Sequence, residues 1–371
     1  MSANQHSDSA AKPLDSAWRK HIRQDVQSMH AYAIQDSTGM VKLDAMENPF
    51  GLSAELQSQL GQRLSALALN RYPGERVNVL RHALAQYAQM PEGFDIMLGN
   101  GSDELITLVS VACDVPGANF LAPVPGFVMY AMSAQLQGIQ FQGVPLTANF
   151  ELNEAAMLSA IAKHKPAVVY LAYPNNPTGT QWDADVIERI VVAQGQQGGL
   201  IVMDEAYQPF ASQTYMDRIA KHGHVLLMRT LSKFGLAGVR LGYMVGPKAL
   251  VAEIDKVRPP YNISVLNCEC ALFALEHADV FAEQAAQIRQ ERQKLTDALA
   301  ALPGLQVFPS QANMLLVRMP DATKCFDGMK TKGILVKNVS KMHPLLHNCL
   351  RLTVGTPSEN AQMLAALKES L

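Results

Sequence analysis

One lysine and one arginine stand out in the stretch Arg229–Tyr243, which reads R-T-L-S-K-F-G-L-A-G-V-R-L-G-Y. Lys233 comes shortly after an apolar run and two hydroxyl residues, Thr230 and Ser232, and Arg240 lies seven residues further on. A lysine amine can form a Schiff base with an aldehyde, while an arginine and hydroxyl groups can bind a phosphate. The stretch therefore suits a cofactor that carries both groups, although a surface lysine in a glycine-rich loop would look the same locally.

Three apolar segments lead up to this lysine and are predicted to be buried strands. They are Pro166–Tyr173, Gly199–Met203 and His224–Met228, and a predicted helix over Asp183–Gln196 separates the first two. Apolar strands that alternate with helices are typical of a parallel sheet with crossover connections. In such sheets ligands bind beyond the carboxyl ends of the strands, so the residues that follow each strand are the candidates for chemistry.

Each of these strands delivers polar side chains at its carboxyl end: Asn176, then Asp204 and Tyr207, then Lys233. This set matches the needs of pyridoxal phosphate (PLP). Lys233 would bond the aldehyde, Asp204 would keep the ring nitrogen protonated, and Tyr207 and Asn176 would donate to the ring oxygen. Taken singly, Asp204 could be a helix cap and Tyr207 or Asn176 could be structural, so the prediction depends on their convergence.

A further turn, Gly99–Glu104, lies between a predicted strand over Phe94–Leu98 and a predicted helix over Glu104–Ala112. A helix that begins in a glycine-rich turn points backbone N–H groups at an anion. The backbone amides of Ser102 and Asp103, together with Thr230, Ser232 and Arg240, would then hold the cofactor phosphate, although Ser102 or Asp103 could instead be a helix cap. Phe127 could stack on the cofactor ring, with packing in the core as the alternative.

Composition favours a protein that handles small molecules. The chain has 371 residues, 48% of them hydrophobic, and a net charge of −2 with no basic run, which argues against a nucleic-acid partner. Its five cysteines form no C-x-x-C pair, so we expect reduced thiols and no metal site. No signal peptide or membrane-length apolar run is present, and we therefore expect a cytoplasmic protein without a membrane partner.

The sequence predicts three parts: residues 1–45, an N-terminal tail and helix that belong to the small domain; 46–264, a large PLP-binding domain; and 265–371, a small α+β domain. Residues 1–14 are predicted to be a loose tail. The other predicted helices are Asp15–Ser28, Ser53–Leu67, Val77–Gln89, Pro247–Val257, a region over Val265–Leu302 that is broken near His277, and Pro357–Leu371. The other predicted strands are Gln306–Val317, Ile334–Lys337 and Asn348–Val354.

Three motifs together resemble the aspartate-aminotransferase-type PLP enzymes. They are Asn175–Gly179 (N-N-P-T-G), Asp204–Tyr207 (D-E-A-Y) and Thr230–Lys233 (T-L-S-K), in this order, with Arg240 and Arg351 beyond them. The resemblance implies a mainly parallel seven-stranded sheet flanked by helices, with a smaller α+β domain. Within that superfamily the chain is most similar to the histidinol-phosphate aminotransferase family. The segments that carry this second resemblance are Glu47–Gly51, Asn70–Pro73, Gly101–Glu104, Leu236–Gly242 and Cys349–Thr356.

The resemblance also implies a homodimer that converts L-histidinol phosphate and 2-oxoglutarate to imidazole-acetol phosphate and L-glutamate, in histidine biosynthesis. Tyr72 would reach the substrate and the cofactor phosphate of the neighbouring subunit. Arg351 would bind the glutamate carboxylate in one half-reaction and the substrate phosphate in the other. Lys337, which stands where an arginine is expected, and Asn48 would complete the substrate site.

Four alternatives remain open at this point. Two share the fold and the cofactor: a threonine-phosphate decarboxylase and an aromatic amino-acid aminotransferase. A third is a PLP-binding regulator without turnover, which we would expect to lack part of the catalytic set. The fourth is a dinucleotide-binding dehydrogenase, but no G-x-G-x-x-G motif follows a first strand.

Overall fold

The structure is a computed structural model that describes residues 16–29 and 35–371, and the chain divides into two units, Met1–Asp36 and Ser37–Leu371. In the first unit a 3-10 helix spans Ser16–His21 and α1 spans Gln24–Ser28. The prediction of a single helix over Asp15–Ser28 is therefore wrong, because the two helices are separated between His21 and Gln24. Helices of this length are marginal in isolation, so a break costs little. The tail predicted over 1–14 lies outside the described residues.

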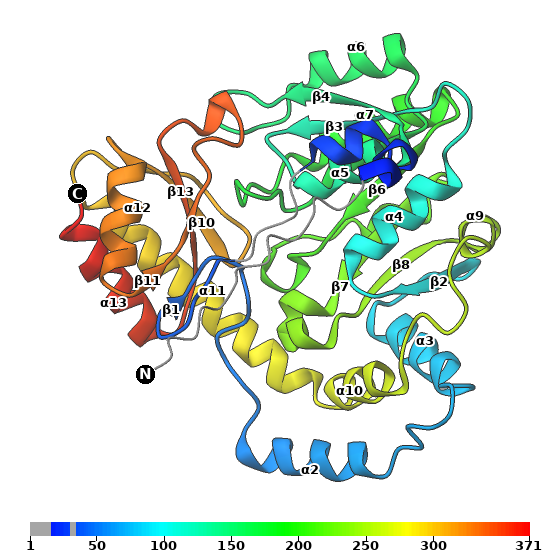
Figure 1. Ribbon diagram of the computed structural model, residues 1–371, viewed down its shortest axis with the longest axis horizontal. Helices are drawn as coiled ribbons and strands as arrows, with labels where there is room; N and C mark the ends of the chain where they lie inside the picture. The colour runs from blue at the N-terminus through cyan, green and yellow to red at the C-terminus, as the bar shows by residue number, and fades with distance from the viewer. Residues whose placement is uncertain (1–15, 30–34) are drawn as a thin grey trace, which may run out of the picture. The chain divides into compact units, whose positions relative to one another are not determined.

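A seven-stranded sheet forms the centre of the second unit, with the strand order β2-β8-β7-β6-β5-β3-β4 (Figure 1). Its strands are β2 (Phe94–Gly99), β3 (Asn119–Val124), β4 (Gln140–Pro145), β5 (Val168–Ala172), β6 (Leu200–Asp204), β7 (Val225–Thr230) and β8 (Gly242–Pro247). Only β8 runs antiparallel to its neighbours, which confirms the mainly parallel sheet. Every residue of β5 and β7 is buried, as expected of strands covered on both faces.

Alternate residues of each strand face two different apolar cores. In β6, Ile201 and Met203 join one core and Val202 joins the other. The first core contains side chains of α3, α6 and α7, and the second contains side chains of α4, α5 and α9. The helices around the sheet are α3 (Arg76–Tyr87), α4 (Ser102–Ala112), α5 (Val128–Gln137), α6 (Glu154–His164), α7 (Ala184–Gln196), α8 (Met216–Ile219) and α9 (Lys248–Asp255).

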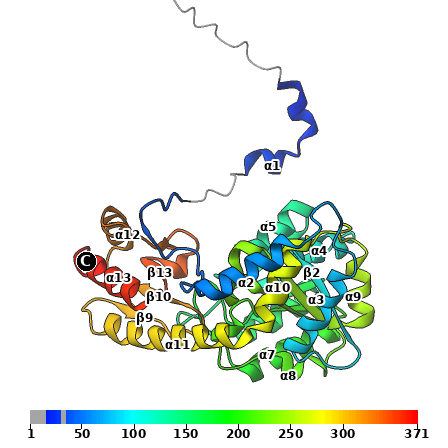
Figure 2. The same cartoon turned by 90° about the horizontal axis from the view of Figure 1, so that it is seen from below.

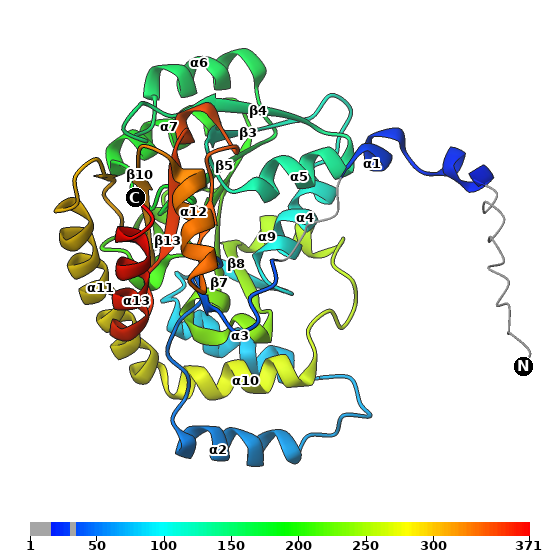
Figure 3. The same ribbon diagram turned by 60° about the vertical axis from the view of Figure 1, so that its left-hand side comes forward.

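A second, smaller sheet lies in the C-terminal part of the chain, with the order β12-β13-β10-β9, and a separate parallel pair joins β1 to β11. The strands are β1 (Val41–Lys42), β9 (Gln306–Val307), β10 (Met314–Arg318), β11 (Ile334–Leu335), β12 (Lys337–Asn338) and β13 (Cys349–Thr353). The helices α11 (Ala278–Ala300), α12 (Ala322–Thr331) and α13 (Pro357–Lys368) lie beside these strands (Figure 3) and share a third apolar core with all of them except β12.

The long helical region is broken at His277, as predicted, into α10 (Val265–Glu276) and α11. α10 packs on α3 and on α2 (Ala54–Ser65) (Figure 2), and the Ser53 side chain caps α2 by accepting the Leu56 N–H. The strand predicted over Gln306–Val317 is wrong as one element. It forms β9 and β10, and in the turn between them the Ser310 hydroxyl donates to the Met314 carbonyl oxygen at 2.6 Å.

Glycines allow the β2–α4 turn to lie directly on β8. The helix begins at Ser102 and not at Glu104, and its N-cap is Gly101, at φ 81°, so neither Ser102 nor Asp103 is the cap. A Cβ on Gly242, the first residue of β8, would lie 2.8 Å from the Gly101 carbonyl carbon and 2.9 Å from the Ser102 nitrogen. This close approach brings the N-terminus of α4 to the carboxyl edge of the sheet.

We expect Gly242→Ala to destabilise the protein, because the added methyl group meets backbone atoms that no side-chain rotation can move away. The expected loss is about 1–3 kcal/mol, the usual cost of overpacking. Denaturant unfolding of both proteins measures it. Gly238→Ala is the matched control, because a Cβ there would meet nothing within 4 Å. Equal stability of the two variants would contradict the close approach.

Candidate active site

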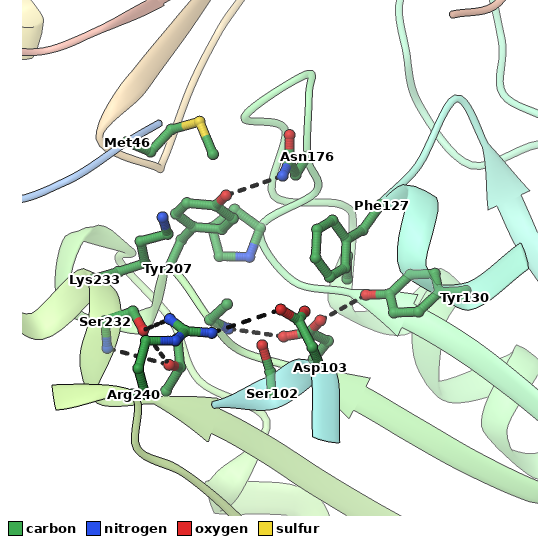
Figure 4. Close-up of a pocket in the computed structure, with 15 residues that line it drawn as sticks. Met46, Ser102, Asp103, Phe127, Tyr130, Asn176, Tyr207, Ser232, Lys233 and Arg240 are labelled. Carbon is green, nitrogen blue, oxygen red and sulfur yellow. Dashed lines mark hydrogen bonds and ion pairs between the residues drawn. The ribbon is translucent and has the colours of Figure 1, made fainter. Parts of the chain in front are cut away.

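The carboxyl edge of the large sheet carries a cavity of about 120 Å³, lined by the residues that follow successive strands (Figure 4). The sequence prediction named ten of the lining residues: Ser102, Asp103, Phe127, Asn176, Asp204, Tyr207, Thr230, Ser232, Lys233 and Arg240. The other five are Met46, Tyr130, Ala172, Pro174 and Ala206. The convergence that the sequence suggested is therefore present in the structure.

Lys233 lies in a π-helical turn, Ser232–Leu236, that follows β7 directly. Its Nζ donates to the Ala45 carbonyl oxygen at 2.7 Å. Burial, and after it the nearby Arg351 and Arg240 cations, lower the pKa of this amine to about 8, although Glu47 opposes the shift. A much larger share of the amine is neutral near pH 7 than in an ordinary lysine, and the neutral form is the nucleophile.

Asp204 ends β6 and is only 4% exposed. Tyr130 donates its hydroxyl to Oδ2 at 2.7 Å, and the Ala206 N–H donates to Oδ1 at 3.0 Å. Burial raises the pKa of the carboxyl to about 6, and these two hydrogen bonds oppose that rise. A buried carboxylate of this kind is stabilised by a cation that faces it from the cavity.

Tyr207 and Asn176 are joined to each other and to an arginine. The Asn176 Nδ2 donates to the Tyr207 hydroxyl at 3.0 Å, while its Oδ1 accepts from Nη1 of Arg351 at 2.8 Å. Burial raises the pKa of Tyr207, and the Arg351 cation opposes that effect. The phenol therefore remains protonated and is available as a donor within the cavity.

The part of the cavity below Lys233 in Figure 4 is built to receive an anion. Ser102 and Asp103 form the first turn of α4, where backbone N–H groups have no partner within the helix. Arg240 donates from Nη1 to the Ser232 hydroxyl at 3.2 Å, and its Nη2 lies 3.7 Å from the Asp103 carboxylate. The Thr230 hydroxyl lies 3.1 Å from that of Ser232. A guanidinium, two hydroxyl groups and a helix N-terminus together suit a phosphate.

The four predicted substrate residues do not line this cavity. Arg351 lies next to it, in β13, and Lys337 is its register partner in β12, so their side chains leave the sheet on the same face. Asn48 donates to the Phe234 carbonyl oxygen at 3.3 Å and to Gln284 at 2.9 Å. Tyr72 is 75% exposed and stacks on Tyr261 with ring centroids 4.2 Å apart.

Sequence reasoning missed Tyr130 and Met46. The only signal for Tyr130 was its place three residues after Phe127, which is one turn along a helix. Met46 has φ 52°, and its backbone is fixed because its N–H donates to the Thr353 hydroxyl at 3.2 Å and its oxygen accepts from Asn313 at 3.0 Å. Nothing local to residue 46 indicated these contacts.

The segment before Met46 accepts hydrogen bonds from two cations, Lys233 and Arg351. The Asp44 carbonyl oxygen accepts from Nη2 of Arg351 at 2.6 Å, and the next carbonyl, that of Ala45, accepts from Lys233. Two adjacent peptide groups therefore fix the position of the reactive amine and of the guanidinium.

The described residues show neither a metal centre nor a membrane helix. Within 16–29 and 35–371, no group of three or more His, Cys, Asp or Glu side chains could hold a metal ion. In the same part of the chain, no helix is long and apolar enough to cross a membrane.

The family model for aminotransferase class I and II matches residues 38–367. The chain belongs to this family. A histidinol-phosphate aminotransferase from Polaromonas naphthalenivorans is 72% identical over 358 residues, which cover 96% of this chain and 98% of that protein. One from Methylibium petroleiphilum is 67% identical over 366 residues, 99% of each chain. Both resemblances drawn from the motifs are thereby confirmed.

The fold of this aminotransferase agrees with that of solved members. The crystal structure of histidinol-phosphate aminotransferase from Sinorhizobium meliloti in complex with pyridoxal-5'-phosphate has a TM-score of 0.83, and the match covers 94% of this chain and 97% of that chain. At 24% sequence identity this likeness shows the fold alone. The predicted PLP-transferase fold is confirmed.

We expect the Lys233 amine of the aminotransferase to titrate near pH 8, because burial and neighbouring cations destabilise its charged form. Competitive acetylation across pH, read for Lys233 by mass spectrometry, measures this pKa. In Arg351→Met one neighbouring cation is gone, so the pKa should rise. Titration near 10.4, the ordinary lysine value, would contradict the burial argument.

Proposed function

We propose that this aminotransferase uses PLP to transfer the amino group of L-histidinol phosphate to 2-oxoglutarate, in L-histidine biosynthesis. The observation that carries the proposal is the 72% identity to a histidinol-phosphate aminotransferase over nearly the whole of both chains. The cavity supports it independently, because Lys233, Asp204 and Arg240 lie together at one sheet edge. We include a cytoplasmic location in the proposal.

The residues present fit the proposed cofactor. Asp204 is a buried carboxylate held by neutral donors, which suits a protonated pyridine nitrogen. Ser102, Asp103, Thr230, Ser232 and Arg240 would hold the phosphate in the anion-binding part of the cavity. When bound, PLP supplies an electron sink for the negative charge that develops at the substrate Cα.

Lys233 would act twice in the proposed reaction. Its neutral amine would hold the cofactor through the aldehyde, and its Nζ, when free, would take the proton from the substrate Cα. Tyr207 and Asn176 would donate to the ring oxygen, and Phe127 would cover the ring. A lysine pKa near 8 suits this exchange of protons near neutral pH.

Arg351 would bind the anionic end of both substrates, the carboxylate of glutamate and the phosphate of histidinol phosphate. Its two terminal nitrogens now donate to Asn176 and to the Asp44 carbonyl, so an incoming anion would take the place of neutral acceptors. Charge-assisted, forked hydrogen bonds favour that replacement. Lys337 would add a second cation from the neighbouring strand, and Asn48 would support the substrate site.

A homodimer is part of the proposal, and Tyr72 would reach the substrate and the cofactor phosphate of the neighbouring subunit. Three exposed apolar side chains support it: Leu69 is 66% exposed, Tyr72 75% and Tyr261 58%. Aromatic side chains are enriched at interfaces, where they bury a large area. The boundaries 1–45, 46–264 and 265–371 likewise stay a proposal for the domains.

Incubation of the purified protein with PLP, L-histidinol phosphate and 2-oxoglutarate should produce glutamate. Lys233→Ala should abolish turnover, and borohydride treatment should then leave no pyridoxyl label at residue 233. Carbon dioxide release from threonine phosphate, without glutamate, would instead identify the decarboxylase alternative. Faster turnover of aromatic amino acids would favour an aromatic aminotransferase. PLP binding without turnover of any of these substrates would favour the regulator.

Arg351→Ala should raise KM for both glutamate and histidinol phosphate by roughly 10- to 100-fold, the range expected when a hydrogen bond to a charged group is lost. Steady-state kinetics of the two half-reactions give the values. Lys368→Ala, which removes a cation from the exposed side of α13, is the control. A loss confined to one substrate would show that the two anions do not share a site.

A further inference from the structure

The Tyr130 hydroxyl donates directly to Oδ2 of Asp204, at 2.7 Å. The residue comes from α5 and is 2% exposed, so its hydrogen bond is shielded from water. Burial and the adjacent Asp204 charge raise the pKa of the phenol. The hydroxyl therefore stays protonated and acts as a donor to this carboxylate.

The ring of Tyr130 has little freedom to move. It stacks on Tyr170 of β5 with centroids 4.5 Å apart and planes 9° apart. Phe127 meets it edge-on at 5.6 Å and 85°. Because the ring is fixed on two sides, the direction in which the hydroxyl approaches Asp204 is fixed as well.

The two oxygens of Asp204 each receive one neutral donor, Tyr130 on Oδ2 and the Ala206 N–H on Oδ1. Together these donors favour the ionised form and fix the rotation of the carboxylate. A neutral donor does so without adding a cation that would compete with a positively charged ligand. The remaining lone pairs are left for a group within the cavity.

We infer that Tyr130 is a positioning residue of the cofactor site: its hydroxyl holds the Asp204 carboxylate ionised and oriented, and thereby sets the affinity for the pyridine nitrogen of PLP. The inference rests on the proposed function, since it concerns the same site. It differs from a packing role, because it depends on the hydroxyl and not on the ring.

Tyr130→Phe removes the hydroxyl and keeps the ring that supports Phe127. Equilibrium titration of the apoprotein with PLP should show affinity at neutral pH reduced about tenfold, the scale of one hydrogen bond to a charged group. Affinity should fall as pH drops through the Asp204 pKa, and in the variant this fall should begin at higher pH. The same ligand is used throughout, so its own titration cancels in the comparison.

Tyr170→Phe is the matched control, because it removes a buried hydroxyl from the ring stacked on Tyr130. Its PLP affinity should stay within about twofold of wild type, as expected for a hydroxyl that does not bond the carboxylate. If both variants lost affinity equally, or if Tyr130→Phe kept the wild-type affinity and pH profile, the inference would be wrong while the proposed function stood. A wild-type protein that failed to bind PLP would overturn both.

Site-specific 3-fluorotyrosine at position 130 provides a second test, in case the phenylalanine variant does not fold. Fluorine beside the hydroxyl makes it a stronger donor and leaves the ring in place. The ionised carboxylate should be favoured further, so the fall in PLP affinity should begin at lower pH than in wild type. A shift to higher pH, or none, would overturn the inference.

Discussion

A carboxylate buried at the end of a parallel strand is the constraint on which the rest of the site depends. Asp204 is buried at the last position of β6, and there its charge is costly unless donors or a cation compensate it. Among the described residues its hydrogen-bond donors are neutral, the Tyr130 hydroxyl and the Ala206 N–H. The carboxylate therefore keeps a negative charge that a cationic ring can compensate, so the site favours a ligand of that kind.

The backbone at the same edge of the sheet builds the positive end of the site, which can bind an anion. Gly242 lets β8 lie against the first turn of α4, and Arg240, at φ 55°, turns the chain so that its guanidinium reaches Ser232. The site thus separates a negative end at Asp204 from a positive end at Arg240 and the α4 N-terminus. A ligand with a cationic ring nitrogen and a phosphate fits only one way round.

The sequence predicted strands such as β5 and β7, whose apolar residues form an uninterrupted run. β5 and β7 are wholly buried, so their apolar runs were visible, whereas β4 is largely exposed and mixed in composition and was not predicted. β8 reads G-Y-M-V-G-P, whose glycines and proline suggest a turn. It forms a strand because it pairs with both β2 and β7, and such long-range pairing has no local signature.

The same distinction applies to the site. Asn176, Asp204 and Lys233 could be found because each follows a strand whose end the sequence marks. Tyr130 could not, because its contact depends on α5 bringing the hydroxyl to Asp204 at the end of β6, an arrangement that only the folded chain defines. The contact between Arg351 and the Asp44 carbonyl joins residues 307 apart, and the backbone group involved carries no side-chain signal at all.

The contact between Arg351 and the Asp44 carbonyl also brings two cations that are far apart in the sequence, Arg351 and Lys233, close together. Lys233 lies in the turn after β7 and Arg351 lies in β13 of the smaller sheet, yet they donate to the consecutive carbonyls of Ala45 and Asp44. Met46, held by Asn313 and Thr353, fixes the orientation of this short segment. The segment keeps the two cations close together. Because like charges destabilise each other, the Arg351 cation lowers the pKa of Lys233. The guanidinium that would bind the substrate anion thus also helps to keep the reactive amine neutral.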